Sequence, residues 1–205
     1  MVDHFTRLNL PRRPWLDGEQ LRQRFHDLSA DAHPDQSHNA DAVIKVEKQN
    51  DFTEINEAYQ CLDDTKCRVR HLIELERGKA PDNVQSIPAE MTDWFMEIGN
   101  TCRKVDAFLV KKENQDSPMM QATLMVEGLV FNDEVSALHS RLQKELARVD
   151  AELLELCPEW EELDGQVEDR ADTLPLAKLE ALGQRLSFWV KWSAQLGERS
   201  SRLMF

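Results

Sequence analysis

The residues that could carry chemistry in this chain are six histidines, four cysteines and 38 carboxylates. His26 and His33 lie seven positions apart, and no histidine combines with cysteines or carboxylates at metal-ligand spacing. The cysteines form no CxxC pair; they are Cys61, Cys67, Cys102 and Cys157. The chain also lacks a phosphate-binding P-loop and a GxSxG nucleophile elbow. We therefore expect no metal, no cofactor and no catalytic residue.

One short stretch stands apart from this background, the tripeptide His33, Pro34 and Asp35 within the sequence LSADAHPDQ. Proline has no amide hydrogen and disfavours helical geometry for the residue before it, so a helix should end near Ala32 or His33. The tripeptide then forms an exposed loop between two helices. Two interpretations stay open: a recognition loop, or a simple helix stop whose aspartate starts the next helix.

Two helices should position this loop. Asp17 is suited to cap the first, whose apolar stripe consists of Leu21, Phe25, Leu28 and Ala32. The second is expected over residues 42–62, and its inward face consists of Val46, Ile55, Tyr59 and Leu62. Two antiparallel helices with one apolar stripe each pack face to face and hold the loop at the tip.

The rest of the chain also favours helices. A short helix is expected over residues 3–10, and another from Thr65 to Gly78, with Gly78 as a left-handed terminator. We place a domain boundary at a linker over residues 79–87, between residues 1–78 and 88–205. Helices over about 88–112, 118–156 and 175–204 predict a three-helix bundle, and the acidic stretch 157–174 is expected to be a solvated loop or frayed helix end. The predicted fold class is all-α.

Charge and hydropathy exclude several classes of function. The formal net charge is −13, which disfavours binding to nucleic acid or to an anionic membrane. No apolar run approaches the roughly 20 residues that cross a bilayer, and the N-terminus lacks the features of a signal peptide. We therefore expect a cytoplasmic protein whose cysteines are reduced thiols.

A basic stretch interrupts this acidic background. Between residues 7 and 24, five arginines stand against Asp17 and Glu19, a local net charge of +3. These arginines are Arg7, Arg12, Arg13, Arg22 and Arg24. They are either ordinary solvated charges or a docking surface for an acidic partner.

Taken together, these residues resemble a J domain. The resemblance rests on the helix LRQRFHDLSADA, the loop HPDQ and the following FTEINEAYQCLDDTKCRVRHLIEL, with Asn56, Ala58, Tyr59, Leu62 and Arg68 at characteristic positions. The segments DHFTRLNLPRRPWLD, RVRHLIELERG and RLSFWVKWSAQL are similar to those of the iron–sulfur co-chaperone HscB family. This resemblance implies a J domain over residues 1–78, followed by a client-binding helical bundle.

The resemblance also implies partners and roles. His33, Pro34 and Asp35, with Arg22 and Arg24, would bind a heat-shock-type chaperone ATPase of the DnaK/HscA type and stimulate its ATP hydrolysis. In the bundle, Phe95, Met96 and Phe188 match positions that contact the client, an iron–sulfur scaffold protein. The stretch 99–104 departs from the Leu- and Glu-rich pattern of the family, and Gln36 stands where the family often has lysine.

Three functional hypotheses follow from the sequence. The first is a J-domain co-chaperone of iron–sulfur cluster assembly. The second keeps the J domain but gives the bundle a different client or an adaptor role, which the altered stretch 99–104 allows. The third is a non-catalytic helical interaction protein in which the tripeptide is only a helix stop.

Overall fold

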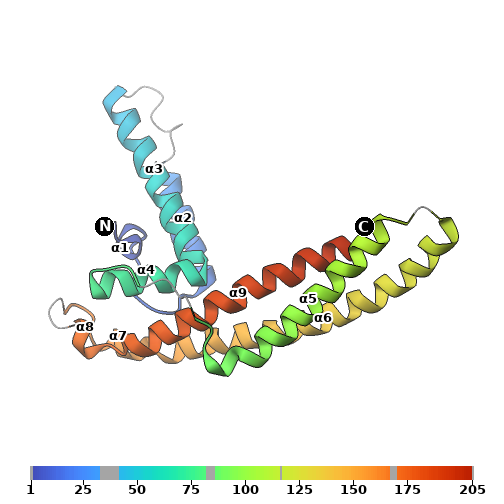
Figure 1. Ribbon diagram of the computed structural model, residues 1–205. Coiled ribbons are helices and arrows are strands. Elements are labelled where there is room, and N and C mark those ends of the chain that lie inside the picture. The colour runs from blue at the N-terminus through green and yellow to red at the C-terminus, as the bar shows by residue number, and fades with distance from the viewer. Residues whose placement is uncertain (1, 33–41, 82–85, 116, 167–169, 205) are drawn as a thin grey trace. The chain divides into compact units, whose positions relative to one another are not determined.

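The computed structural model describes residues 2–32, 42–81, 86–115, 117–166 and 170–204, and within these ranges it contains helices and no strand. The elements in chain order are α1 (His4–Arg7), α2 (Gly18–Ala32), α3 (Ala42–Asp63), α4 (Thr65–Arg77), the 3₁₀ turn η2 (Ala89–Met91), α5 (Thr92–Glu113), α6 (Pro118–Glu155), α7 (Cys157–Glu161), α8 (Arg170–Thr173) and α9 (Leu176–Met204) (Figure 1). The predicted all-α fold is confirmed. None of the helices in these ranges is long and apolar enough to span a bilayer.

The chain forms two compact units. The first contains residues 1–82 and 150–183, and the second contains residues 83–149 and 184–205. The long helices α6 and α9 therefore contribute one part to each unit. The domain limits expected from the sequence, with a linker over residues 79–87, stay a prediction.

The first unit is built on the antiparallel pair α2 and α3, which lie side by side (Figure 1). As predicted, Asp17 caps α2: its Oδ1 accepts hydrogen bonds from the amides of Glu19 and Gln20 at 2.9 and 2.8 Å. Between the two helices, the rings of Phe25 and Tyr59 stack with their centroids 4.2 Å apart. The core of this unit consists of Phe5, Leu8, Leu21, Ile55, Ala58, Leu62, Val69, Leu72 and Ile73, among others.

The turn from α3 to α4 is fixed by polar contacts. The carboxylate of Asp64 caps α4 by accepting from the amide of Cys67 at 2.6 Å. Gly78 ends α4 with φ of 70°, the left-handed conformation expected from the sequence. Cys61 and Cys67 form a disulfide across this turn, so the expectation that all four cysteines are thiols is wrong for these two, while Cys102 and Cys157 are buried and free.

The acidic segment after α6 belongs to the first unit and is not merely solvated. Four of its apolar side chains are buried: Cys157, Trp160, Leu163 and Leu174. Residues 157–161 form α7 and residues 170–173 form α8. The expectation of a solvated loop or frayed helix end is therefore wrong. The apolar residues follow helical spacing, but the acidic residues between them make this pattern difficult to recognise in the sequence.

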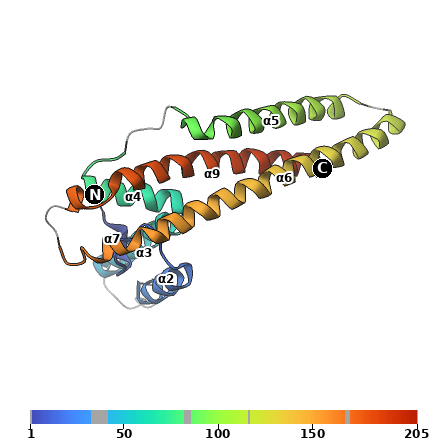
Figure 2. The ribbon, with the colours of Figure 1, turned by 90° about the horizontal axis from the view of Figure 1, so that it is seen from below.

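The second unit is a bundle of three helical segments, consisting of α5, the part of α6 before residue 150 and the part of α9 after residue 183. They run alongside one another in both ribbon views (Figure 2). Its core includes Ile98, Val105, Leu109, Leu124, Val135, Leu142, Trp189, Trp192 and Leu196. A Cβ added at Gly128 would lie 3.3 Å from the ring of Phe108, so the absence of a side chain there allows α6 to pack closely against α5.

Candidate functional site

The tripeptide His33, Pro34 and Asp35 lies outside the described residues, as does Gln36. The structure describes the two helices that flank it. The first of them, α2, is described as far as Ala32, and α3 is described from Ala42 onward. The tripeptide thus joins two helices that pack against each other.

Arg22 and Arg24 are exposed on α2. Residues two apart on a helix do not share a face, so these two guanidiniums lie on opposite flanks of the buried stripe that contains Leu21. Neither has an ion pair within the described part of the chain. Both guanidiniums could therefore bind an acidic partner, but each would contact it from a different flank of α2.

The other three arginines of the basic stretch are occupied within the chain. Arg7 pairs with Asp51 and Glu54 on α3, at 2.7 and 3.2 Å. Arg12 donates to Asp3 at 2.8 Å, and Arg13, whose side chain is 10% exposed, pairs with Asp164. The sequence groups these arginines with Arg22 and Arg24 because all their acidic partners lie outside residues 7–24, and those of Arg7 and Arg13 are distant in the chain.

Arg68 is a structural residue of the first unit. Its buried guanidinium donates to the carbonyl oxygens of Pro14 and Leu62 at 3.2 and 2.6 Å, and to Thr65 Oγ1 at 3.1 Å. Burial lowers the pKa of Arg68, and Asp150 and other nearby carboxylates oppose that shift. This arginine therefore satisfies carbonyls at the end of α3 and joins the loop before α2 to the α3–α4 turn.

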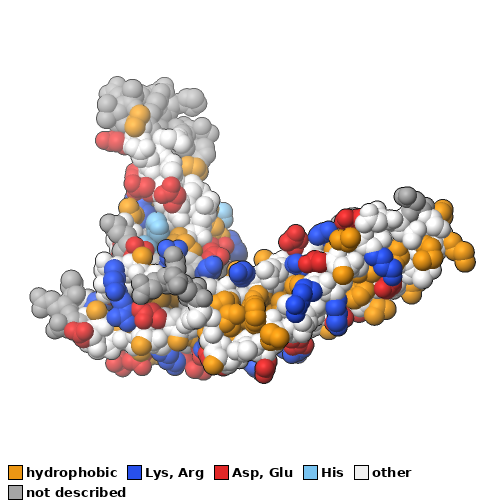
Figure 3. Space-filling view, viewed as in Figure 1, with side chains coloured by type: hydrophobic (Ala, Val, Ile, Leu, Met, Phe, Trp, Pro, Cys, Tyr) orange, Lys and Arg blue, Asp and Glu red, His pale blue; other side chains and the backbone are white. Residues whose placement is uncertain are grey.

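On the bundle, two of the three predicted client-contacting residues are exposed on α5: Phe95 is 45% exposed and Met96 is 52% exposed. Phe188 on α9 is partly buried, and its ring lies 5.5 Å from that of Trp192. Among the described residues, the ring of Phe188 packs against that of Trp192 and not against that of Phe95. Figure 3 shows hydrophobic side chains gathered where α5 begins and α9 passes.

Trp94 belongs to the packing of the bundle. Its ring meets Trp189 edge-on at 5.1 Å, and the guanidinium of Arg141 lies 4.8 Å from its ring centroid. Trp189 and Trp192 are each 4% exposed, in agreement with a core role. Phe95 follows Trp94 directly on α5, so the inward packing of Trp94 places the side chain of Phe95 on the outer side of the helix.

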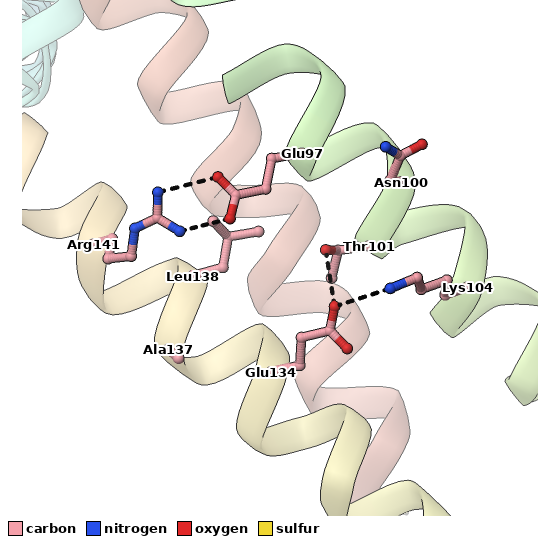
Figure 4. Close-up of a pocket in the computed structure, with 8 residues that line it drawn as sticks. All are labelled: Glu97, Asn100, Thr101, Lys104, Glu134, Ala137, Leu138 and Arg141. Carbon is pink, nitrogen blue, oxygen red and sulfur yellow. Dashed lines mark hydrogen bonds and ion pairs between the residues drawn. The ribbon is translucent and has the colours of Figure 1, made fainter. Parts of the chain in front are cut away.

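A polar cleft of about 360 Å³ lies between α5 and α6 on the same unit (Figure 4). Two ion pairs cross it: Arg141 donates to both carboxylate oxygens of Glu97 at 2.6 and 3.1 Å, and Lys104 lies 3.5 Å from Glu134. Asn100, Thr101, Ala137 and Leu138 complete its lining. The stretch 99–104 therefore contributes to the α5–α6 contact as well as to the outer surface of α5.

No group of three or more histidines, cysteines or carboxylates within the described ranges is arranged to hold a metal ion. Among the described residues, the first unit exposes Arg22 and Arg24 on α2, and the second exposes the apolar side chains of Phe95 and Met96 on α5.

Comparisons with known proteins find relatives of this chain in sequence and in fold. Residues 3–71 match the model of the DnaJ domain. The chain is 29% identical over 75 residues to the co-chaperone protein HscB of Proteus mirabilis, which covers 37% of this chain and 43% of the relative. It is 27% identical over 115 residues to the HscB homologue of Haemophilus ducreyi, covering 56% and 66%, and 33% identical over 112 residues to that of Paraburkholderia phymatum, covering 51% and 63%. The chain therefore spans 43 to 66% of the length of these curated relatives.

Two solved structures share the fold over nearly the whole chain. The chaperone HscB from Vibrio cholerae has a TM-score of 0.57 at 20% identity, covering 98% of this chain and 99% of that one. The human co-chaperone protein HscB has a TM-score of 0.58 at 16% identity, covering 96% and 81%. At such identities the likeness is one of fold.

Proposed function

We propose that this chain stimulates ATP hydrolysis by a DnaK/HscA-type heat-shock chaperone and delivers an iron–sulfur scaffold protein to it. The chain carries a J domain, and it is similar to HscB co-chaperones in sequence and in fold. The observation that carries the proposal is the DnaJ-domain match over residues 3–71, which includes α2, the tripeptide and α3.

The chaperone would dock on the hairpin. His33, Pro34 and Asp35 provide an imidazole and a carboxylate on either side of a rigid proline, between two helices that hold each other through Phe25 and Tyr59. Arg22 and Arg24 add positive charge that no recorded ion pair neutralises within the described residues, in a protein of net charge −13. These charges favour an acidic surface on the chaperone.

The chain itself needs no catalytic residue, metal or cofactor for this task. A protein that binds the hydrolysis-competent conformation of an ATPase more tightly than its resting conformation shifts the equilibrium between them. The chemistry of hydrolysis stays with the chaperone.

The scaffold protein would bind the bundle through exposed apolar side chains. Phe95 provides an exposed aromatic ring on α5, and Met96 provides an exposed, flexible side chain beside it. Phe188 adds part of an aromatic ring from α9. Pull-down with the purified scaffold protein at micromolar concentration tests this part. Absence of binding would favour the second hypothesis, in which the J domain serves a different client or the bundle is an adaptor.

Pro34→Ala separates chaperone docking from a mere helix stop. The docking hypothesis predicts loss of ATPase stimulation by a variant whose circular dichroism and unfolding midpoint match the wild type. The helix-stop hypothesis predicts instead a shifted helix content or stability, with no stimulation by either protein. Ala30→Ser, on the exposed face of α2, serves as the control substitution near the loop.

We further propose that the protein works in the cytoplasm. Fractionation of cells that express the native chain tests this: recovery with the cytoplasmic proteins agrees with the proposal, and recovery in another fraction contradicts it.

A further inference from the structure

The first half of α6 is apolar on two opposite sides. Its inner side packs into the bundle through Leu124 and Val135, which are 2% and 0% exposed. Its outer side, here called the α6 stripe, is exposed and consists of Met119, Ala122, Met125, Val126, Leu129 and Val130. Figure 3 shows hydrophobic side chains gathered along this part of the helix. A helix that is apolar all round is normally covered on every side.

The α6 stripe is large for a surface that faces water. Met119 is 84% exposed, and the other large members are 64 to 68% exposed. At roughly 100 Å² for each of the five large side chains, the stripe offers on the order of 500 Å² of apolar surface. That area lies in the upper part of the range for a patch on a monomer, and it approaches the roughly 600 Å² that each partner contributes to a small stable interface.

The spacing of the α6 stripe is that of a helix–helix seam. Met119, Ala122, Val126 and Leu129 follow one another at steps of three, four and three residues, the a and d positions of a coiled coil. Within residues 117–132 the one charged residue is Glu127, whose carboxylate already pairs with Lys111 of α5 at 2.8 Å. The stripe can therefore be buried against another apolar helix without removing an unpaired charge from water.

We propose that the α6 stripe is a dimer interface, in which it packs antiparallel against the same stripe of a second copy of this chain. An antiparallel register places Met119 opposite Leu129 of the second copy and Ala122 opposite its Val126. This register leaves Asp133, the next residue in the seam, beyond the overlap. A parallel pair would instead bring the two Asp133 carboxylates together, which like-charge repulsion disfavours.

Sedimentation velocity of the full chain from about 1 to 200 μM tests the proposal. The wild type should move from 23.7 kDa toward twice that mass as its concentration rises. Leu129→Glu should weaken association at least tenfold. Leu154→Glu is the matched control, because Leu154 is also exposed on α6, at 48%, but lies outside the stripe. It should associate like the wild type.

The double variant Met119→Lys with Leu129→Glu tests the register, because it creates two ion pairs across the antiparallel interface. It should associate at least tenfold more tightly than Leu129→Glu alone, and absence of this rescue overturns the antiparallel register. A wild type that stays at 23.7 kDa throughout overturns the proposal and leaves the stripe to a different protein. Equal weakening by Leu129→Glu and Leu154→Glu also overturns it. Circular dichroism of each variant confirms that the helices are intact.

Discussion

The guanidinium of Arg170 donates to both carboxylate oxygens of Glu76, at 2.9 and 2.8 Å, although the two residues are 94 positions apart. Their side chains are only 11% and 2% exposed. This pair joins α4, at the end of the region that matches the DnaJ domain, to the acidic segment that follows α6. Together with the Arg13–Asp164 pair, it gives that segment a structural role within the first unit.

Removing Arg170 should destabilise the protein strongly. In Arg170→Gln the buried carboxylate of Glu76 loses its bidentate partner and, among the described residues, keeps only the ion pair with Arg12, at 3.7 Å. We expect a loss of about 3 kcal/mol in the free energy of unfolding, the low end for breaking a buried pair. Urea unfolding followed by circular dichroism measures it. Arg77→Gln, which breaks a half-exposed pair with Glu180, should cost less than about 1 kcal/mol, and an equal cost for both variants would refute this account.

Replacing Arg68 by lysine should also destabilise the first unit. A lysine keeps the charge, but it cannot reach the three oxygens that the planar guanidinium binds. Leaving buried carbonyls without donors should lower the free energy of unfolding by about 2 kcal/mol. Arg70→Lys, at an exposed position of the same helix, is the control and should be neutral within about 0.5 kcal/mol.

His71 should make stability sensitive to mild acid. Burial lowers the pKa of His71, and neighbouring His4 lowers it further. The neutral ring is the form that accepts a hydrogen bond from the His4 amide at Nε2, at 3.2 Å. Other charged groups near the ring act in both directions: Asp3 and Glu74 raise its pKa, and Arg12 lowers it.

The pKa of His71 in the folded protein lies below the unfolded value of about 6.5. At pH values between these two, the unfolded chain therefore binds more protons than the folded protein. The stability contribution of His71 is therefore complete above about pH 6.5 and is lost as pH falls toward the folded pKa. Urea midpoints measured between about pH 7.5 and 5 should fall less steeply for His71→Gln than for the wild type. His26→Gln, at an exposed position, should follow the wild type, and identical slopes for all three proteins would contradict the prediction.

The proposed client surface can be tested without disturbing the fold. Phe95→Ala and Met96→Ala remove exposed side chains of α5 and should each weaken scaffold binding about tenfold, measured by titration calorimetry. Their unfolding midpoints should match the wild type. Val110→Ala, also exposed on α5, is the matched control and should bind normally. If all three variants bind alike, the client does not contact this end of α5.

Local patterns explain most of what the sequence predicts correctly. The Asp17 cap, the inward positions of Phe25 and Tyr59 and the Gly78 terminator each depend on neighbours within one helix or one hairpin. The partners of Arg13 and Arg170 could not be predicted, because 151 and 94 residues separate them from Asp164 and Glu76.

Two further differences have physical reasons. Trp160 and Leu163 repeat at helical spacing after Leu156, but the acidic residues between them suggested a solvated segment. A helix that is apolar on both sides does not show from its sequence which side stays exposed, as the outer residues of α6 do.

The most direct test of the central claim is the steady-state ATPase rate of a DnaK/HscA-type chaperone, measured with wild type and with Asp35→Asn. This substitution removes one charge at constant side-chain size in the segment of sequence between α2 and α3. The account predicts that the wild type stimulates hydrolysis several-fold and that Asp35→Asn, with unchanged circular dichroism, does not. Equal stimulation by both proteins, or none by the wild type, would contradict it.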